Sequence, residues 1–345
     1  MARTTFSVAT FNMYNLQDAD TPLYATSKPW TPEEFKRKTE WAAWQLGTLG
    51  ADIVGLQEVW SKSALEAVLA VDPQSLADEY DVLATPAVGT SITCAALVRK
   101  GLLTGKPKWI TDFPKAVRLE SRDDPADPQA PVIDVSIKSF SRPVLNFQVQ
   151  LRDDEPATEI FVVHLKSKLP TQISKEAWYK KSSATYRPHQ QALGDGISTI
   201  RRTAEAVAVR VLLNGVMRDT ETPVVVLGDI NDGKESNTAN ILTSQPRYLV
   251  GDSQGGSDFG LYSAQTLQEY RDTRDVYYTH VHQDLRESLD HVMVSEQFYD
   301  HSRKRVWLFE GLLINNDHLN FENHRETGTG DHGIVRVSFK HDPVK

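Results

Sequence analysis

The sequence predicts a fold of the α/β or α+β class, in which strand-like and helix-like segments alternate along the chain. Short apolar runs of strand length recur from end to end, and amphipathic segments with helix caps lie between several of them. The 345 residues are 40% hydrophobic and 24% charged, which is typical of a globular protein with a substantial core. The chain has no repeats and no linker rich in Gly, Ser or Pro, so we expect one domain over residues 1–345.

The beginning of the chain carries the clearest element signals. Residues 7–16, SVATFNMYNL, are typical of a strand that runs into a loop. Residues 31–50 show the signals of a helix, which are Thr31 as the cap, Pro32 at the first position, Glu34 as the capping-box partner and Gly50 at the end. A strand over 53–59, IVGLQEV, and a second helix over 63–71, SALEAVLAV, are predicted to follow.

The middle of the chain is predicted to consist mostly of strands. Five segments are rich in apolar residues and bounded by polar turns, namely 81–85, 91–100, 132–138, 141–151 and 160–166. The last of these contains four consecutive apolar residues, which indicates burial on both faces. The polar stretches 122–131 and 152–157 are expected to be turns. Cys94, the only cysteine, excludes an internal disulfide and is expected to be a buried thiol.

The rest of the chain combines a long helix with late strands. The helix is predicted over about 197–216, where Arg201 and Glu205 have the i,i+4 spacing of an ion pair. The segment before it, about 169–196, is a long insertion that is polar, basic and aromatic by turns, and connections of this length are usually functional or mobile. Later strands are predicted within TPVVVLGDIND, SLDHVMVS and GIVRVSF.

Several predicted strands end in polar groups suited to catalysis. The residues concerned are Asn12, Glu58, His164, Asp229, Asn231 and Asp290, and a later turn adds Asp331 and His332. One carboxylate or histidine at a strand end is usually structural. The presence of all of them beside apolar strands instead predicts a shared cleft, because a buried strand end aims its side chain rigidly.

The motifs FNMYNL, LQEVW, VVHLKSK, VVLGDIND, SLDHVMVS and GDHGIV resemble, in this order, those of the endonuclease/exonuclease/phosphatase superfamily, the group similar to pancreatic deoxyribonuclease. The resemblance extends from about residue 6 to 340, and the ordered set is specific although each motif alone is weak. It implies a four-layer α/β/β/α sandwich of two mixed sheets flanked by helices, with the active site at one end. It also implies hydrolysis of phosphate esters that depends on Mg²⁺ or Mn²⁺, ions that prefer oxygen ligands.

The resemblance also implies a role for each matching residue. Glu58 would be the main metal ligand with Asn12 beside it, and Asp331 would lie near the metal, directly or through water. Asp229 would orient and deprotonate the attacking water. Asn231 would hold a phosphate oxygen.

Two histidines and two lysines would face the substrate. His332 would face the phosphate, positioned by Asp290, and a carboxylate partner favours the charged imidazolium. His164 would be another phosphate-facing donor. Lys166 and Lys168 would line the path of the substrate backbone, although lysines at a solvated strand end would look the same.

Arg142 matches an arginine common in nucleases of this group and is a further candidate for binding substrate. The chain also departs from the family pattern. Some relatives place a second acidic ligand where this chain has Tyr14, and Asn15 is one possible substitute. Trp60 stands where some deoxyribonuclease-like members have an arginine. These departures bear on substrate preference more than on chemistry.

Three functions are consistent with these motifs. The first is a metal-dependent nuclease, most similar to bacterial members and acting on DNA or RNA. This function is supported by the insertion, whose aromatic and basic residues could stack on bases and contact the nucleic acid backbone. The alternative is a surface flap packed by its own aromatic residues. The residues concerned are Trp178, Tyr179, Lys180, Lys181, Tyr186, Arg187 and His189. The second is a phosphatase or phosphodiesterase acting on a small-molecule or lipid phosphate ester. The third, an inactive scaffold, is disfavoured because every motif residue is present.

The net charge and the first residues of the chain bear on its partners and its location. The formal charge is −8, from 46 acidic and 38 basic residues, which argues against coating nucleic acid nonspecifically but allows cleavage at a metal site. We expect a nucleic acid substrate, DNA first, with no membrane and no obligate protein partner. The first residues lack signal-peptide features, so a cytoplasmic protein is expected, although a trimmed secreted form would look the same. His318 and His324 are either solvated loop histidines or ligands of a second metal.

Overall fold

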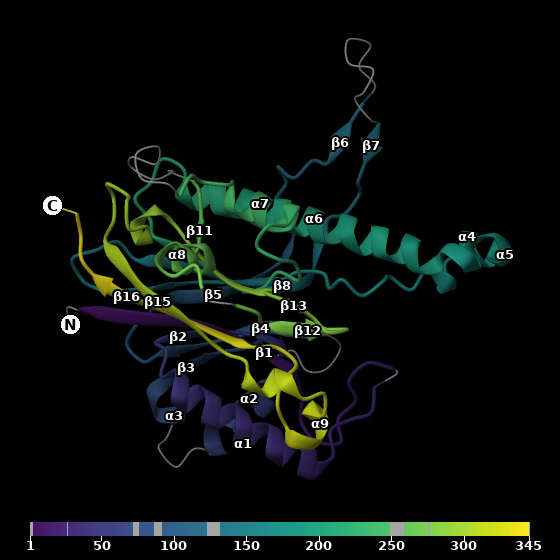
Figure 1. Ribbon diagram of the computed structural model, residues 1–345, viewed down its shortest axis with the longest axis horizontal. Coiled ribbons are helices and arrows are strands. Elements are labelled where there is room, and N and C mark those ends of the chain that lie inside the picture. The colour runs from purple at the N-terminus through teal and green to yellow at the C-terminus, as the bar shows by residue number, and fades with distance from the viewer. Residues whose placement is uncertain are drawn as a thin grey trace.

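The computed structural model describes residues 3–25, 27–71, 76–85, 92–122, 132–248, 259–274 and 277–344. Two six-stranded sheets lie face to face, and helices cover the outer face of each (Figure 1). The predicted four-layer α/β/β/α sandwich of two mixed sheets is therefore confirmed. None of the helices in these ranges is long and apolar enough to cross a membrane.

The first sheet contains the N-terminal strands and the last two. Its strand order is β15-β16-β1-β2-β4-β3. The bounds are β1 Thr5–Leu16, β2 Ile53–Val59, β3 Tyr80–Leu83, β4 Thr93–Arg99, β15 Trp307–Asn315 and β16 Ile334–His341. Because β1 and β2 are parallel, their carboxyl ends meet at one edge of the sheet. The outer layer consists of α1 Pro32–Leu49, α2 Lys62–Val71 and α3 Leu76–Glu79.

The second sheet holds the middle of the chain, in the order β11-β14-β10-β9-β8-β5. The bounds are β5 Leu103–Asp112, β8 Ser139–Val149, β9 Thr158–His164, β10 Val224–Asp229, β11 Tyr262–Ser263 and β14 Asp290–Val294. Here β9 and β10 are the parallel pair. The outer layer consists of α6 Gln190–Met217 and α7 Asn237–Thr243, whereas α8 Ala264–Arg271 lies at the edge of the sandwich, where it contacts both β14 and β15.

Smaller elements lie at the ends of the sandwich. Two hairpins project from it, β6 Glu120–Ser121 with β7 Ile133–Asp134, and β12 His280–His282 with β13 Leu285–Glu287. Residues 169–196 form η1 Ile173–Lys175, α4 Ala177–Lys181, α5 Ser183–Tyr186, η2 Arg187–His189 and the start of α6. The remaining short helices are η3 Glu296–Phe298, η4 Asp317–Asn320 and α9 His324–Thr327.

The packing of β9 confirms the prediction that this strand is buried on both faces. Ile160 and Val162 belong to the core between the sheets, whereas Phe161 and Val163 pack toward α6. Successive side chains of a strand point to opposite faces, so a strand between two layers must be apolar at every position. Cys94 is buried between the sheets, as expected.

The predicted helix at 31–50 is confirmed down to its caps. The Glu34 backbone N–H donates to Thr31 Oγ1 at 3.2 Å, and the Thr31 N–H donates to Glu34 Oε2 at 2.9 Å. Gly50 ends the helix with a φ of 52°, a left-handed conformation that glycine adopts at little cost.

Three element predictions were wrong. Of the strand expected over 132–138, only Ile133–Asp134 is a strand, in a hairpin that projects from the body and leaves Val132 exposed. The long helix begins at Gln190 rather than near 197, because a 3₁₀ turn leads into it without a side-chain cap. The edge strand Leu103–Asp112 was not predicted, because it contains a Gly and a Pro, which edges tolerate.

The turn predicted over 152–157 is confirmed. The one predicted over 122–131 lies outside the described residues except for its first position.

Candidate active site

Strand pairing brings three predicted catalytic residues side by side. In the second sheet, Asp229 at the end of β10 is the register partner of His164 on β9 and of Asp290 on β14. Side chains at paired positions of neighbouring strands share one face of the sheet. The pairing therefore explains why residues 65 and 61 positions from Asp229 converge on one edge.

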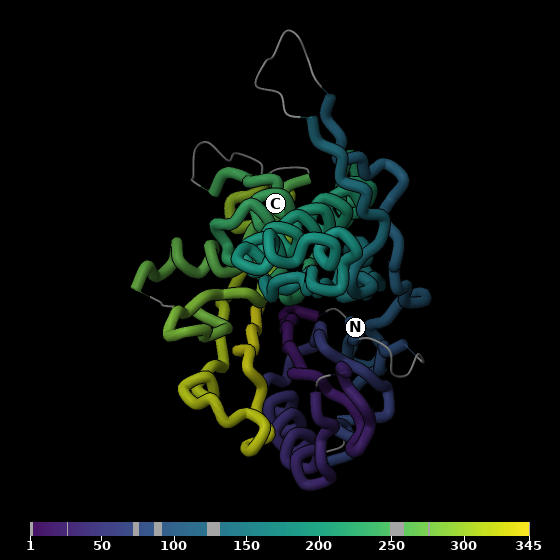
Figure 2. Tube along the Cα trace, turned by 90° about the vertical axis from the view of Figure 1, so that its right-hand side faces the viewer, coloured from purple at the N-terminus to yellow at the C-terminus, as the bar shows by residue number. Residues whose placement is uncertain are grey.

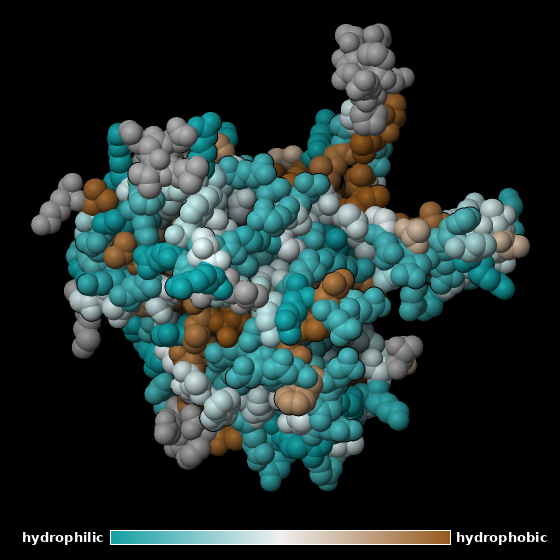
Figure 3. Space-filling view, viewed as in Figure 1, coloured by the Kyte–Doolittle hydropathy of each residue, from teal (hydrophilic) through white to brown (hydrophobic). Residues whose placement is uncertain are grey.

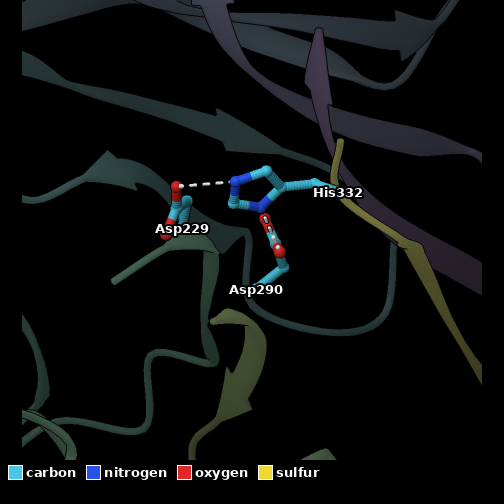
Figure 4. A group of neighbouring side chains, drawn as sticks. All are labelled: Asp229, Asp290 and His332. Carbon is cyan, nitrogen blue, oxygen red and sulfur yellow. Dashed lines mark hydrogen bonds and ion pairs between the residues drawn. The ribbon is translucent and has the colours of Figure 1, made fainter. Parts of the chain in front are cut away.

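His332, in the loop before β16, lies between the two aspartates (Figure 4). Its Nδ1 is 2.7 Å from Asp290 Oδ2, and its Nε2 is 4.0 Å from Asp229 Oδ2. Burial favours the neutral ring, but the charges of Asp290 and Asp229 outweigh it and raise the pKa of His332 well above its usual value. His332 is therefore an imidazolium that donates one N–H to Asp290.

Asp229 is buried and held from two sides. Its Oδ1 accepts the Asn231 backbone N–H at 2.7 Å, and its Oδ2 accepts Asn12 Nδ2 at 3.3 Å. Burial raises the pKa of Asp229 to about 7, while the positive charge of His332 acts in the opposite direction. A carboxylate that titrates near neutral pH can accept a proton under physiological conditions.

His164 differs from His332 in charge. Its Nε2 lies 3.5 Å from Asp229 Oδ2, and its buried Nδ1 has no hydrogen-bond partner in the described part of the chain. Burial, together with the positive charges of Arg142 and His332, lowers the pKa of His164 well below its usual value. Of the two predicted phosphate-facing histidines, only His332 carries positive charge.

Asn231 contributes to the shape of this edge. It has a φ of +55°, and its Nδ2 donates to the Leu165 carbonyl at 3.0 Å. Arg142 Nη1 donates to the same carbonyl at 3.1 Å. These contacts hold the end of β9 against the loop that follows β10, and they place Arg142 beside the site.

The carboxyl ends of β1 and β2 form the opposite wall. Glu58 has a φ of +59°, which is unusual for a residue with a side chain, and its Oε2 accepts the Asn15 N–H at 2.9 Å. Burial and the negative charge of Asp331 raise the pKa of Glu58. Two neighbouring carboxylates in a partly buried site fit a divalent cation, which would relieve their repulsion.

Asn12 connects the two walls, because its Oδ1 accepts the Tyr14 N–H at 3.0 Å while its Nδ2 reaches Asp229. The possible substitute ligand Asn15 is engaged elsewhere. Its Oδ1 accepts Trp60 Nε1 at 3.0 Å, so Asn15 orients Glu58 through its backbone. Trp60, a departure from the family pattern, thus supports the Glu58 wall.

Asp229, Asp290 and His332 form a group of side chains close enough together to share one metal ion. One ligand atom each of Asp229, Asp290 and His332 lies within 4.8 Å of the others. An imidazolium has no lone pair to offer, because both ring nitrogens carry protons. His332 would therefore have to lose a proton to act as a ligand in this cluster.

Lys166 and Lys168, the two lysines predicted to contact substrate, both have hydrogen-bond partners within the protein. Lys168 Nζ is 2.6 Å from Glu287 Oε1, and Lys166 Nζ donates to the carbonyls of Ser167 and Leu169. The charge of Lys168 is therefore paired within the protein, whereas Lys166 bonds to neutral carbonyl groups.

With this geometry established, comparison with known proteins identifies the family. The model of the Endonuclease/Exonuclease/phosphatase family matches residues 9–332. The chain belongs to this family. Family members are phosphoesterase hydrolases that depend on divalent metals, so the chain is a phosphoesterase of this superfamily. No curated protein matches the chain in sequence.

Solved structures of the family share the fold at low identity. An endonuclease/exonuclease/phosphatase from Bacteroides vulgatus is 15% identical, with 99% of this chain and 100% of that chain covered and a TM-score of 0.53. D. rerio TDP2 complexed with single strand DNA product is 14% identical, covering 98% and 100%, with a TM-score of 0.54. A Bacteroides thetaiotaomicron mannosyl-6-phosphatase is 14% identical, covering 97% and 99%, with a TM-score of 0.50.

The family motifs did not indicate Lys38, a residue of helix α1 that is buried near Glu58 and Asp331. Its Nζ lies 5.0 Å from the Tyr14 ring centre and 4.8 Å from that of Trp30. Burial lowers the pKa of Lys38 to about 7, against the opposing effects of Asp331 and Glu58. A lysine in the basic run Lys36-Arg37-Lys38 of an amphipathic helix is typical of a solvated face, so no sequence signal pointed to Lys38.

The β12–β13 hairpin was also missed. His280, His282 and Glu287 line a cavity of about 520 Å³ together with Asp331 and His332. The centres of the His280 and His332 rings are 5.1 Å apart. The three-residue strands are too short for a periodic pattern, which explains the omission.

His318 and His324 lie in the short helices η4 and α9, and each has a hydrogen-bond partner in the protein. Both are partly buried, with ring centres 6.5 Å apart. His318 Nε2 lies 2.8 Å from the His332 carbonyl oxygen, and His324 Nδ1 lies 2.9 Å from Thr329 Oγ1. These contacts support the loop that carries Asp331 and His332.

Glu205 does more than form the predicted ion pair. Arg201 Nε donates to its Oε1 at 3.1 Å, but Glu205 also accepts the backbone N–H groups of Ser141 and Lys166 at 2.8 and 2.7 Å. A buried carboxylate on α6 thus holds the chain on both sides of the site edge.

Proposed function

We propose that this protein is a nuclease that hydrolyses phosphodiester bonds of DNA with the aid of Mg²⁺ or Mn²⁺. The observation that carries the proposal is the arrangement of Asp229, a base that titrates near neutral pH, against the imidazolium of His332. Their 4.0 Å separation is too long for a direct hydrogen bond, and an oxygen beside the pair, off the line that joins them, can lie within about 2.8 Å of both atoms.

In this mechanism Asp229 accepts a proton from the water whose oxygen attacks phosphorus in line with the ester bond that breaks. His332 places positive charge against the phosphoryl oxygens, and Asp290 keeps its ring oriented and charged. His164, neutral in this site, borders the same space. Asn231 offers an amide near the phosphate.

Glu58, Asp331 and Asn12 would hold the metal ion. When bound there, the ion would neutralise phosphoryl charge and assist departure of the leaving oxygen. Lys38 lies behind this wall, and because its pKa is lowered to about 7 it would lose its proton more readily with a cation bound there.

The DNA assignment is supported by the fold shared with TDP2, whose structure contains a single strand DNA product, and by the basic and aromatic residues of 169–196. A second candidate is a phosphatase or phosphodiesterase acting on a small phosphate ester. This candidate is favoured because Lys168 is paired with Glu287 and because the carboxylates of Glu287 and Asp195 line the cavity, where they would repel a long phosphate backbone. One structural neighbour is a mannosyl-6-phosphatase.

A substrate panel tests the proposal. Supercoiled plasmid, linear duplex, single-stranded DNA, bis-p-nitrophenyl phosphate and p-nitrophenyl phosphate would each be incubated with Mg²⁺, Mn²⁺ or EDTA, beside Asp229→Ala. We expect DNA cleavage that is lost in EDTA and in the variant. Hydrolysis of the small esters without any DNA cleavage would instead establish the second candidate.

A further inference from the structure

Residues 169–196, called the arm below, form a run of short helices that leads into the start of α6. Residues 165–168 separate the arm from the end of β9, and α4 and α5 project from the body at the N-terminal end of α6 (Figure 1). In Figure 2 the same segment points toward the viewer. We propose that the arm binds single-stranded nucleic acid that leads away from the scissile phosphate. This inference deepens the proposed nuclease function and rests on it.

Two neighbouring hollows connect the catalytic edge with the arm. The cavity of about 520 Å³ contains Asn231 and His332 on its wall and reaches Leu169, Pro170 and Gln191. These three residues also line a second hollow of about 660 Å³, which continues to Arg187. A strand whose phosphate lies at His332 therefore has a concave path onto the arm.

Three aromatic residues of the arm pack on one another, and one of them has a ring available to a ligand. Tyr179 is buried, and its hydroxyl donates to Gln190 Oε1 at 2.6 Å, which ties α4 to the start of α6. Trp178 remains 42% exposed, with its ring edge-on to Tyr186 at 4.8 Å. Unpaired bases stack on exposed aromatic rings regardless of sequence, whereas paired bases in a duplex are not available for this.

The charge of the arm suits a phosphate backbone. It carries four basic residues, Lys175, Lys180, Lys181 and Arg187, against two acidic ones, a net charge of +2 in a chain of −8. All four are exposed, and no carboxylate of the described chain lies within ion-pair distance of them, unlike Lys168. Figure 3 shows the arm as a largely hydrophilic surface, as expected of a polyanion site rather than an apolar docking face.

Binding measurements in EDTA test the arm without cleavage. Fluorescence anisotropy would follow labelled thymidine oligonucleotides of about 4 and about 16 nucleotides, the range of known single-strand site sizes. The variants are Trp178→Ala and the double Lys180→Glu/Lys181→Glu. The controls are Trp44→Ala, an exposed tryptophan on α1, and Lys36→Glu/Lys62→Glu, exposed lysines of the first helical layer. A uridine oligonucleotide of the longer length distinguishes RNA from DNA.

We expect both arm variants to weaken binding of the longer oligonucleotide at least about fivefold, the lower end for loss of a stacked base, and to change the shorter one less than about twofold. The double variant should also reduce the salt dependence of binding. Hydrolysis of bis-p-nitrophenyl phosphate should be unchanged, which shows that the variants fold. Equal binding of both lengths by the wild type, or unchanged affinity in the variants, would overturn the arm proposal. Cleavage of small esters but no oligonucleotide would contradict the nuclease function itself.

Discussion

Asp229 Oδ2 faces His332 Nε2 across 4.0 Å, while the other side of the His332 ring is bonded to Asp290. A base and a cation are thus close enough for one oxygen at their side to contact both, yet too far apart to bond directly to each other. Because Asp290 supplies the charge that keeps His332 protonated, the pair Asp290 and His332 gives the first test of the site.

Asp290→Asn should keep the shape of the site but lower the pKa of His332, because the amide removes the adjacent negative charge. We expect kcat for bis-p-nitrophenyl phosphate to fall by about 10²-fold or more. The loss of activity toward high pH should begin at lower pH than in the wild type, since the imidazolium deprotonates earlier. Steady-state kinetics across pH check both, with exposed Asp317→Asn as the control. An unchanged profile would remove Asp290 from the mechanism.

Asp229→Asn should remove the destabilisation that ionised Asp229 causes above neutral pH. The pKa of Asp229 is raised on folding to about 7, so the folded state resists ionisation. This destabilising effect is absent at pH below the unfolded pKa, grows as the pH rises, and is complete above about 7. The amide has only one acceptor oxygen for the N–H groups of Asn231 and Asn12, which costs about 1–3 kcal/mol at every pH. We therefore expect the Tm of the variant, relative to that of the wild type, to rise by about 2–4 °C from acid to alkaline pH. Calorimetry at both pH values measures this difference, and a Tm difference that is the same at both would contradict the assignment.

Glu58→Gln should weaken metal binding. Replacing one of two carboxylates halves the anionic charge at the metal wall, and we expect Kd for Mn²⁺ to rise at least about tenfold, or about 1.4 kcal/mol. Stability in EDTA should not fall, because the variant relieves repulsion from Asp331. Isothermal titration calorimetry gives the affinity, with exposed Glu79→Gln as the control. Equal Mn²⁺ affinity would place the metal elsewhere, with the Asp229, Asp290 and His332 cluster as the alternative.

Glu205→Gln should reduce both stability and activity. The amide has only one acceptor oxygen, so the N–H of Ser141 or Lys166 loses its partner, which costs about 1–3 kcal/mol. Urea denaturation measures this cost, and Glu66→Gln, in the exposed pair with Lys62, should cost about 0.5 kcal/mol or less. If the two variants are equally stable, Glu205 does not hold the site edge.

Sequence reasoning found the strand ends but not what surrounds them. Asp229 and His164 were predictable because each ends an apolar strand that must lie between two layers. The family resemblance supplied the topology that makes them register partners. Lys38 could not be found, since a lysine in an amphipathic helix looks like a surface charge until the tertiary packing buries it.

The charge states also required the structure. His164 and His332 are both histidines in family motifs, yet one lacks a carboxylate hydrogen-bond partner and the other has Asp290 at 2.7 Å. Only the packing decides which nitrogen finds a partner, and therefore which ring is charged. In the same way, the basic run HLKSK predicted free lysines, whereas the unpredicted hairpin brings Glu287 against Lys168.

The most direct test of the central claim is the pH dependence of kcat for bis-p-nitrophenyl phosphate at saturating Mg²⁺, in the wild type and Asp229→Asn. The wild type should show an ascending limb that begins at or below about pH 7, because a bound cation would lower the pKa of Asp229 further. The variant should lose about 10²-fold or more of the rate and lack this limb. A variant that keeps the limb and most of the rate would show that Asp229 is not the base.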